Sequence, residues 1–230
     1  MNIENGIRAS TGYSYLKPAR RRGNLHIVKH ALVQRVLLEE KKATGVECEI
    51  NGRTHCYHAR REVIIAAGAI GSPHLLQTSG IGAPAALTEA GIEPLHELPG
   101  VGENLQDHLE FNFQYRCKQP ITLNSKLDLI SKAKIGLRWL LFRDGLGSTN
   151  HFEACAFIRS RAGVKWQDIQ YHFLPGAIAY DGSSALKGHG FKVHVGHTNT
   201  HNRGFIRKVD ATLRTDNMIT ISSHQTKLDT

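Results

Sequence analysis

The sequence predicts a mixed fold of helices and strands, in the α/β (α+β) class, that divides into two parts. An Asn51-Gly52 pair separates two alternating runs, residues 44–50 and 54–59, and this pattern indicates a β-hairpin because both turn residues favour positive φ. The continuous apolar run 62–67 is typical of a strand buried on both faces. Near residue 110 the composition shifts to further alternating runs.

The elements before the hairpin are short. Residues 12–16 predict a helical turn inside the polar and basic segment 1–24. We expect a strand over residues 25–29, because Leu25 and Ile27 fall on one face, and a second extended stretch over 31–38.

The apolar run 62–67 leads directly into a predicted helix. Glycine follows at position 68, and Ser72-Pro73 supplies an N-cap and a residue suited to the first helical turn, so we expect a helix over 72–78. Residues 84–90 repeat the same pattern. A strand, a glycine and a helix N-terminus can bring free N–H groups to a phosphate or an electron-rich ring, although many α/β proteins have this unit without a ligand.

The second part continues with strands and one long helix. Apolar residues alternate over 111–117, and helical spacing over 127–142 predicts a helix. Three more strands are expected, over 152–158, 169–174 and 191–195. Residues 197–230 lose clear periodicity and stay unassigned.

Charge and motif content exclude several classes of function. The net charge is +9, yet no zinc-finger spacing or ribonucleoprotein motif accompanies it, so we expect no nucleic-acid partner. The four cysteines form no C-x-x-C pair. His194, His197 and His201 have helical metal-ligand spacing, but the first lies in a predicted strand and no carboxylate accompanies them, so no metal site is predicted.

The glycine–helix segment resembles the second signature of the glucose–methanol–choline (GMC) oxidoreductases, a family of flavin enzymes. The shared positions are Gly68-Ala69-x-x-Ser72-Pro73-x-Leu75-Leu76-x-x-Ser79-Gly80-Ile81-Gly82. Further segments resemble the family as well, and the likeness covers roughly residues 5–204. These further segments include Arg8-x-Ser10-Thr11, Asn24-Leu25, Leu98–His108, Phe152-Glu153, Phe157–Ser160, Gln170–Pro175 and His194–Gly196.

This resemblance implies two domains and FAD as the cofactor. Residues 1–110 would form the C-terminal portion of a Rossmann-like FAD-binding domain, and 111–230 part of an antiparallel-sheet substrate domain, with 197–230 unassigned. The family's G-x-G-x-x-G fingerprint and its catalytic His, near the family's C-terminus, have no counterpart in this chain. We therefore expect an internal fragment of a longer enzyme, with no family catalytic residue inside it.

The resemblance also assigns cofactor-binding residues. Val33 would contact the FAD adenine through its backbone, although a plain core residue would look the same. Ala67 and Gly68 would lie beneath the adenine–ribose part, where a glycine permits close approach. Ser72 would cap the helix beside them, and capping alone would also explain it.

For the substrate, the resemblance to the choline-oxidising members singles out Glu153, which would pair with a trimethylammonium group. Such a cation donates no conventional hydrogen bond, so charge and aromatic faces must hold it, and Phe152 and Phe157 are local candidates. His172, on a predicted strand, suits a proton relay, with a structural histidine as the alternative. Glu153 could equally be an exposed carboxylate at a strand edge.

The expected activity is alcohol oxidation by hydride transfer to flavin, with choline to betaine aldehyde as the reaction. Three alternatives remain open: another alcohol within the family, a non-catalytic truncated fragment, and a basic interaction module. The sequence leaves the electron acceptor unassigned, and membrane association of the parent enzyme is a further expectation. The compartment also stays open: cytoplasmic or membrane-associated in a bacterium, mitochondrial in a eukaryote.

Overall fold

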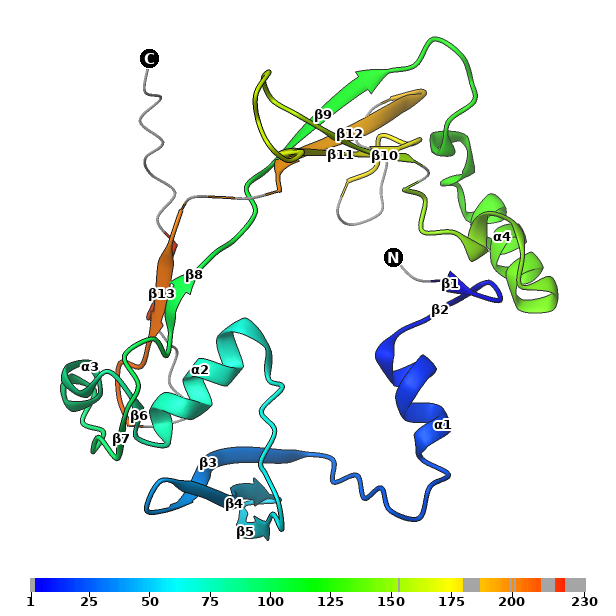
Figure 1. Cartoon of the computed structure of the whole chain (residues 1–230). Coiled ribbons are helices and arrows are strands. Elements are labelled where there is room, and N and C mark those ends of the chain that lie inside the picture. The colour runs from blue at the N-terminus through cyan, green and yellow to red at the C-terminus, as the bar shows by residue number, and fades with distance from the viewer. Residues whose placement is uncertain are drawn as a thin grey trace. The chain divides into compact units, whose positions relative to one another are not determined.

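The computed structural model describes residues 3–152, 154–179, 187–198, 200, 202–211 and 218–221 (Figure 1). The chain forms two compact units, each made of two segments. Unit 1 comprises Met1–His26 and His108–Asn199, and unit 2 comprises Ile27–Asp107 and Thr200–Thr230. The domain boundary at residue 110, which follows the family's division, stays a prediction.

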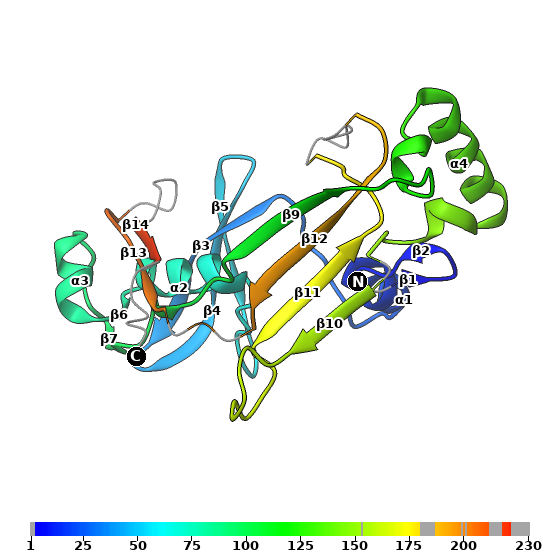
Figure 2. The ribbon, with the colours of Figure 1, turned by 90° about the horizontal axis from the view of Figure 1, so that it is seen from above.

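Unit 1 contains an antiparallel four-stranded sheet in the order β10-β11-β12-β9, seen side by side in Figure 2. All four strands were predicted, with small differences at their ends. Their bounds are β9 Glu110–Arg116, β10 Ala154–Ile158, β11 Ile169–Leu174 and β12 Gly190–His197. Their register sets four residues in one row across the sheet: Cys155, His172, His194 and Asn112.

The two faces of this sheet differ sharply in chemistry. Because side chains alternate along a strand, the row above shares its face with Lys192 and Glu110, whereas Phe111, Phe113 and Tyr115 point to the opposite face. The polar face is the buried one in β12, where Lys192 is 5% exposed and His194 is 9% exposed. On the aromatic face of β9, Phe111 is 57% exposed, Phe113 48% and Tyr115 50%.

The long helix of unit 1, α4, spans Leu129–Phe142, within the predicted range. Asp128 caps it by accepting a 2.9 Å hydrogen bond from the Ser131 backbone N–H, and bonds from Ser131 lower the pKa of Asp128. Trp139 Nε1 donates to the carbonyl oxygen of Gly6 at 2.6 Å. Gly6 belongs to a small hairpin that the sequence did not reveal.

Short elements complete unit 1. The hairpin consists of β1 (Ile3–Glu4) and β2 (Ile7–Arg8). The expected turn is a π-helix over Gly12–Leu16, continued by α1 (Lys17–Ala19). Two 3-10 helices span Leu123–Lys126 and Gly145–Ser148.

Unit 2 begins with the predicted hairpin. The antiparallel sheet β3-β4-β5 spans Ala31–Glu39, Lys42–Ile50 and Arg53–His58. Asn51 and Gly52 form the turn between β4 and β5 with φ of 52° and 75°, which confirms the reason for predicting it.

The rest of unit 2 packs around helix α2. The small core cluster of unit 2 lies in and after the next helix and consists of Leu87, Ala90 and Ile92. The helices are α2 (Gly68–Thr78) and α3 (Pro84–Glu89). The strands are β6 (Ile81–Gly82), β7 (His96–Glu97), β8 (Glu103–Leu105), β13 (Gly204–Arg207) and β14 (Met218–Ile221). The last two lie in the region that periodicity left unassigned, and β13 pairs with both β8 and β14.

A buried glutamine ties α2 to β13. Gln77, 5% exposed, donates through Nε2 to the carbonyl oxygens of Ile206 at 2.8 Å and Val101 at 3.3 Å. Its Oε1 accepts from the backbone N–H of Lys208 at 2.9 Å. One side chain therefore satisfies three backbone groups from two distant segments.

Two predicted strands were wrong. Residues 62–67 form no strand, and their burial alternates, with Ile64 79% exposed between half-buried neighbours. Residues 25–29 also form none. A strand needs a partner for its backbone groups, and among the described residues no strand pairs with either segment.

Candidate functional site

Three of the predicted cofactor-binding residues meet at the start of α2. Ala67 is the N-cap residue, Gly68 is the first helical residue, and Ser72 lies one turn inside the helix. The prediction that the helix starts at Ser72 was therefore wrong by four residues. Ser72 Oγ nevertheless accepts a 3.1 Å hydrogen bond from the Ala67 backbone N–H, so it stabilises the entry to the helix from within.

Gly68 makes this helix start accessible. Its φ is +82°, a conformation that favours glycine, and no atom lies within 4 Å of the place where a Cβ would stand. Ala67 and Gly68 are both exposed, and no side chain of the N-cap residue occupies the first helical N–H groups. A ligand can thus approach the backbone closely and accept hydrogen bonds from it.

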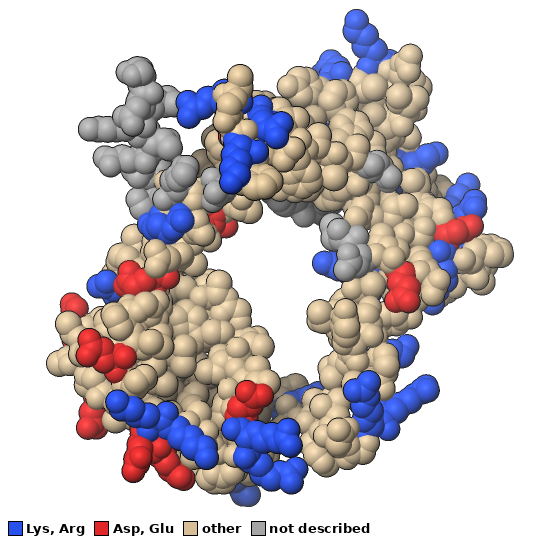
Figure 3. Space-filling model, in the orientation of Figure 1, with Lys and Arg blue, Asp and Glu red and all other residues tan. Residues whose placement is uncertain are grey.

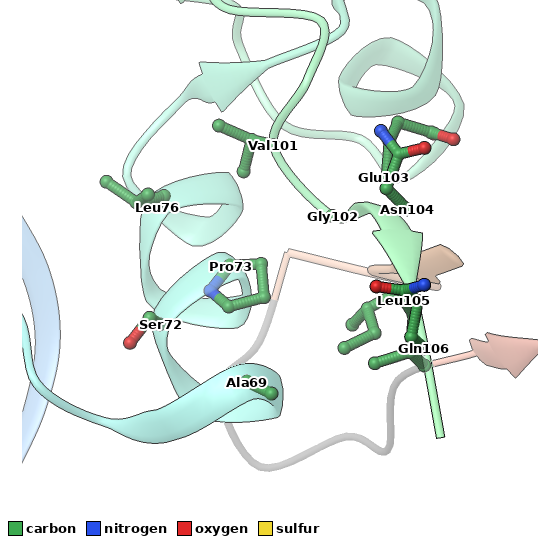
Figure 4. Close-up of a pocket in the computed structure, with 11 residues that line it drawn as sticks. Ala69, Ser72, Pro73, Leu76, Val101, Gly102, Glu103, Asn104, Leu105 and Gln106 are labelled. Carbon is green, nitrogen blue, oxygen red and sulfur yellow. The ribbon is translucent and has the colours of Figure 1, made fainter. Parts of the chain in front are cut away.

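A cavity of about 460 Å³ lies along the same helix within unit 2. Ala69 and Pro73 of α2 form one wall, and the segment from Val101 to Gln106 forms the other (Figure 4). Figure 4 shows Pro73 turned toward this segment and the Ser72 hydroxyl turned away from it. The helix start therefore borders a space of ligand size.

The fourth predicted residue, Val33, lies on β3, which packs against α2. It is half-buried and stands at an irregularity in the β3–β4 register, between its pairing with Cys48 and that of Arg35 with Glu47. A bulge re-aims the backbone locally, which suits a residue expected to act through its main chain.

The predicted substrate residues of unit 1 lie on the polar face of its sheet. The Phe152 ring stands edge-on against the His172 imidazole, with ring centroids 5.8 Å apart. His172 Nε2 accepts from the Gln170 amide at 2.7 Å. Glu153 lies outside the described residues, so its assignment stays a prediction.

Sequence reasoning missed two residues of this cluster. His194 is the direct cross-strand partner of His172, and its ring lies 5.5 Å from the Phe152 ring, again edge-on. Its Nδ1 is hydrogen-bonded to Oε1 of Glu110. The alternation of residues 190–197 places Lys192 and His194 on one face of a strand. That signal could have shown that His194 belongs to a sheet face and not to the helical metal-ligand spacing of His194, His197 and His201.

Two searches over the described part of the chain gave negative results. No group of three or more His, Cys, Asp or Glu side chains is placed to hold a metal ion. No helix there has the length and apolar character needed to cross a bilayer.

Comparison with known proteins places this fold and these motifs in one class. Residues 1–110 match the family model described as GMC oxidoreductase. Residues 1–110 therefore carry the N-terminal domain of a GMC oxidoreductase, and FAD is the cofactor of this class.

Two curated relatives illustrate the likeness within the family. Both are named oxygen-dependent choline dehydrogenase. The Photobacterium profundum protein is 59% identical over 206 residues, which cover 90% of this chain and 36% of that protein. The Vibrio vulnificus protein is 57% identical over 211 residues, covering 92% of this chain and 38% of that protein. The chain thus spans little more than a third of these relatives.

Solved structures support the same fold. Pyridoxine 4-oxidase from Mesorbium loti is 26% identical with a TM-score of 0.77, and the match covers 99% of this chain and 41% of that one. Aspergillus oryzae formate oxidase has a TM-score of 0.82 at 20% identity, covering 95% of this chain and 43% of that one. The second likeness concerns the fold alone.

The residues at the start of α2 fit the FAD expected of the family. The open position beside Gly68 leaves room for the cofactor, and the exposed helix start offers N–H donors to its polar atoms. When bound, FAD would supply the hydride acceptor, and this part of the chain would bind and orient it.

The fit gives a testable prediction. Gly68→Ala should weaken FAD binding several-fold, because the new methyl group enters the open space and strains a positive-φ residue. Gly52→Ala is the matched control, since Gly52 also has positive φ and open surroundings but lies in the β4–β5 turn. Flavin fluorescence titrations of both variants measure the difference. Equal losses would assign the effect to backbone strain alone.

Proposed function

We propose that this chain supplies part of the FAD site and the first part of the substrate site of an FAD-dependent alcohol oxidoreductase. The proposed reaction oxidises choline to betaine aldehyde, with hydride transfer to the flavin. The main support is the 59% identity to a choline dehydrogenase over 206 residues, a span that includes most of the chain.

The site chemistry is compatible with a small cationic alcohol. A quaternary ammonium needs aromatic faces and negative charge, and Phe152 lies beside the His194–Glu110 pair. Glu153, the residue proposed to face the cation, follows Phe152 directly in the sequence. Both sites thus have candidate residues of the required kinds.

A chimera tests the proposal. The matching segment of the Photobacterium relative is replaced by this chain's residues, and reduction of the bound flavin by choline is followed by absorbance. We expect choline-dependent bleaching of the flavin bands. A chimera that binds FAD but is not reduced by any primary alcohol would favour the non-catalytic alternative, and reduction by other alcohols alone would favour a different substrate.

In this chimera Glu153→Gln should weaken choline binding about thirtyfold, equivalent to about 2 kcal/mol, with a smaller effect on flavin reduction at saturation. The carboxylate would attract the cation equally in ground and transition states, so its loss is a loss of uniform binding. The measurement is the apparent affinity for choline and for 3,3-dimethylbutan-1-ol, its uncharged analogue. Equal weakening for both compounds would make Glu153 a structural residue.

We also propose that the enzyme attaches to membranes through α4. Five of its six large exposed apolar residues form one continuous arc of the helix, and Phe142 at the C-terminal end lies outside it. The five are Leu129, Ile130, Leu137, Leu140 and Leu141. Lys132, Lys134 and Arg138 lie outside this arc and are exposed, and the helix contains no acidic residue. Blue Lys and Arg atoms border tan surface around α4 in Figure 3. An amphipathic helix with cationic flanks matches an anionic lipid surface.

This attachment predicts that the chain co-sediments with vesicles containing phosphatidylserine, and that Leu137→Glu/Leu141→Glu abolishes most of the binding. Two carboxylates in the apolar arc cannot enter the bilayer interface and repel anionic lipid. Leu25→Glu/Ile27→Glu, which adds equal charge at exposed apolar positions outside α4, is the control. Unchanged binding of the α4 variant would exclude this helix as the attachment site.

A further inference from the structure

Two imidazoles on the polar face of the unit 1 sheet contact the same phenyl ring. His172 and His194 are direct partners across β11 and β12. The Phe152 ring meets both of them edge-on, with interplanar angles of 76° and 75°. Phe152 therefore packs against two titratable side chains at once.

The two histidines differ in how their ring nitrogens are used. His172 Nε2 accepts a hydrogen bond from the Gln170 amide. His194 instead uses Nδ1, which is paired with Glu110. An ionised carboxylate can only accept, so Nδ1–H donates and Nε2 of the neutral ring becomes a bare acceptor.

That acceptor has nothing to accept from among the described residues. His194 Nε2 is buried and makes no hydrogen bond there, while the whole residue is 9% exposed. Burying a polar atom without a partner is unfavourable, so an O–H or N–H donor brought by a ligand would be stabilised at this position. Lys192, the next residue on this face of β12, donates to the carbonyl oxygen of Ile178 at 2.8 Å and is thus directed elsewhere.

We propose that His194 Nε2 is the hydrogen-bond acceptor for the hydroxyl group of a small alcohol ligand. Glu110 is the positioning residue, because it fixes the tautomer of His194. The choice of an alcohol rests on the proposed function. A trimethylammonium group has no donor for Nε2, so in choline the hydroxyl end would occupy this position.

The tautomer of His194 provides the first test, and it needs no ligand. The 230-residue chain is labelled with ¹⁵N at its histidine rings and measured at mildly alkaline pH, where imidazoles are neutral. The signal is assigned by its loss in His194→Phe. We expect an Nδ1–H ring with a bare Nε2 in the wild type, and a mixed tautomer in Glu110→Gln. An Nε2–H ring in the wild type would overturn the proposal.

The second test adds three ligands that separate the two ends of choline. Choline and 3,3-dimethylbutan-1-ol carry a hydroxyl group, whereas ethyltrimethylammonium carries only the cation. We expect the two alcohols to shift the His194 Nε2 resonance and the third compound to leave it unchanged. His194→Phe should weaken binding of the alcohols roughly tenfold, and His197→Phe, at an exposed position of the same strand, should not.

Each outcome is decisive. A shift with dimethylbutanol but not with choline keeps the hydroxyl site and refutes choline as its ligand. A similar shift with ethyltrimethylammonium, or no shift with any compound at saturating concentration, refutes the hydroxyl site. If His194→Phe does not fold, His194→Gln supplies the assignment of the signal, and the wild-type tautomer and the three titrations then decide the question.

Discussion

Gly102→Ala is expected to destabilise unit 2 by about 3 kcal/mol. Gly102 has φ of +85°, and a Cβ there would stand 2.2 Å from the carbonyl oxygen of Ile206 and 2.4 Å from Nε2 of Gln77. The Ile206 backbone N–H also donates to the Gly102 oxygen at 2.7 Å, so the two backbones cannot separate without breaking that bond. Backbone strain and overpacking each contribute roughly 1–3 kcal/mol.

Native-state hydrogen exchange is the suitable measurement, because the two tryptophans, Trp139 and Trp166, both lie in unit 1 and would not report on unit 2. The amides of β8 and β13 should exchange faster in the variant. Gly100→Ala is the control from the same loop, since no atom lies within 4 Å of its Cβ position. Similar exchange in both variants would contradict the close approach of Gly102 to β13.

Gln77→Leu should cost unit 2 about 2–3 kcal/mol. Leucine preserves the approximate volume but leaves the backbone N–H of Lys208 and the oxygens of Ile206 and Val101 without their partner in a buried position. Gln77→Glu keeps the acceptor and loses the donor, so its effect should include a new buried charge as well.

The same exchange experiment on α2 and β13 measures this loss. Gln106→Leu provides the control, because Gln106 makes one exposed hydrogen bond, to the Thr200 oxygen at 2.9 Å. That variant should remain within about 0.5 kcal/mol of the wild type. A Gln77→Leu variant with equally small effect would show that water replaces the lost bonds.

Local signals predicted much of the fold. Asn51-Gly52, the alternation over 111–117 and the helical spacing over 127–142 each depend on neighbouring residues only, and all three elements are present. Residues 62–67 failed for the opposite reason. Their apolar run indicates that these residues could be buried as a strand. A strand forms only beside partner strands, however, and a local pattern carries no information about those partners.

The residues of the candidate site also divide into those that local sequence predicts and those that it does not. Ala67, Gly68 and Ser72 are close in sequence, so their grouping at the start of α2 was predictable. His194 and Glu110 are separated by 84 residues, and only the register of β12 against β9 brings them together. Gln77 and Ile206, 129 residues apart, are a second such pair. Non-local contacts of this kind leave no periodic trace in the sequence.

The order in which the strands pair also constrains how the chain folds during synthesis. The segment that carries β8 and β9 is made early, yet its partners β13 and β12 follow some 75–100 residues later. At a synthesis rate of roughly 5–20 residues per second, these two strands wait on the order of 4–20 s for their partners. Throughout that interval β9 lacks its partner strand β12, and its aromatic residues can form non-native contacts. Nascent chains of this protein should therefore depend on chaperones most strongly between the emergence of β9 and that of β12.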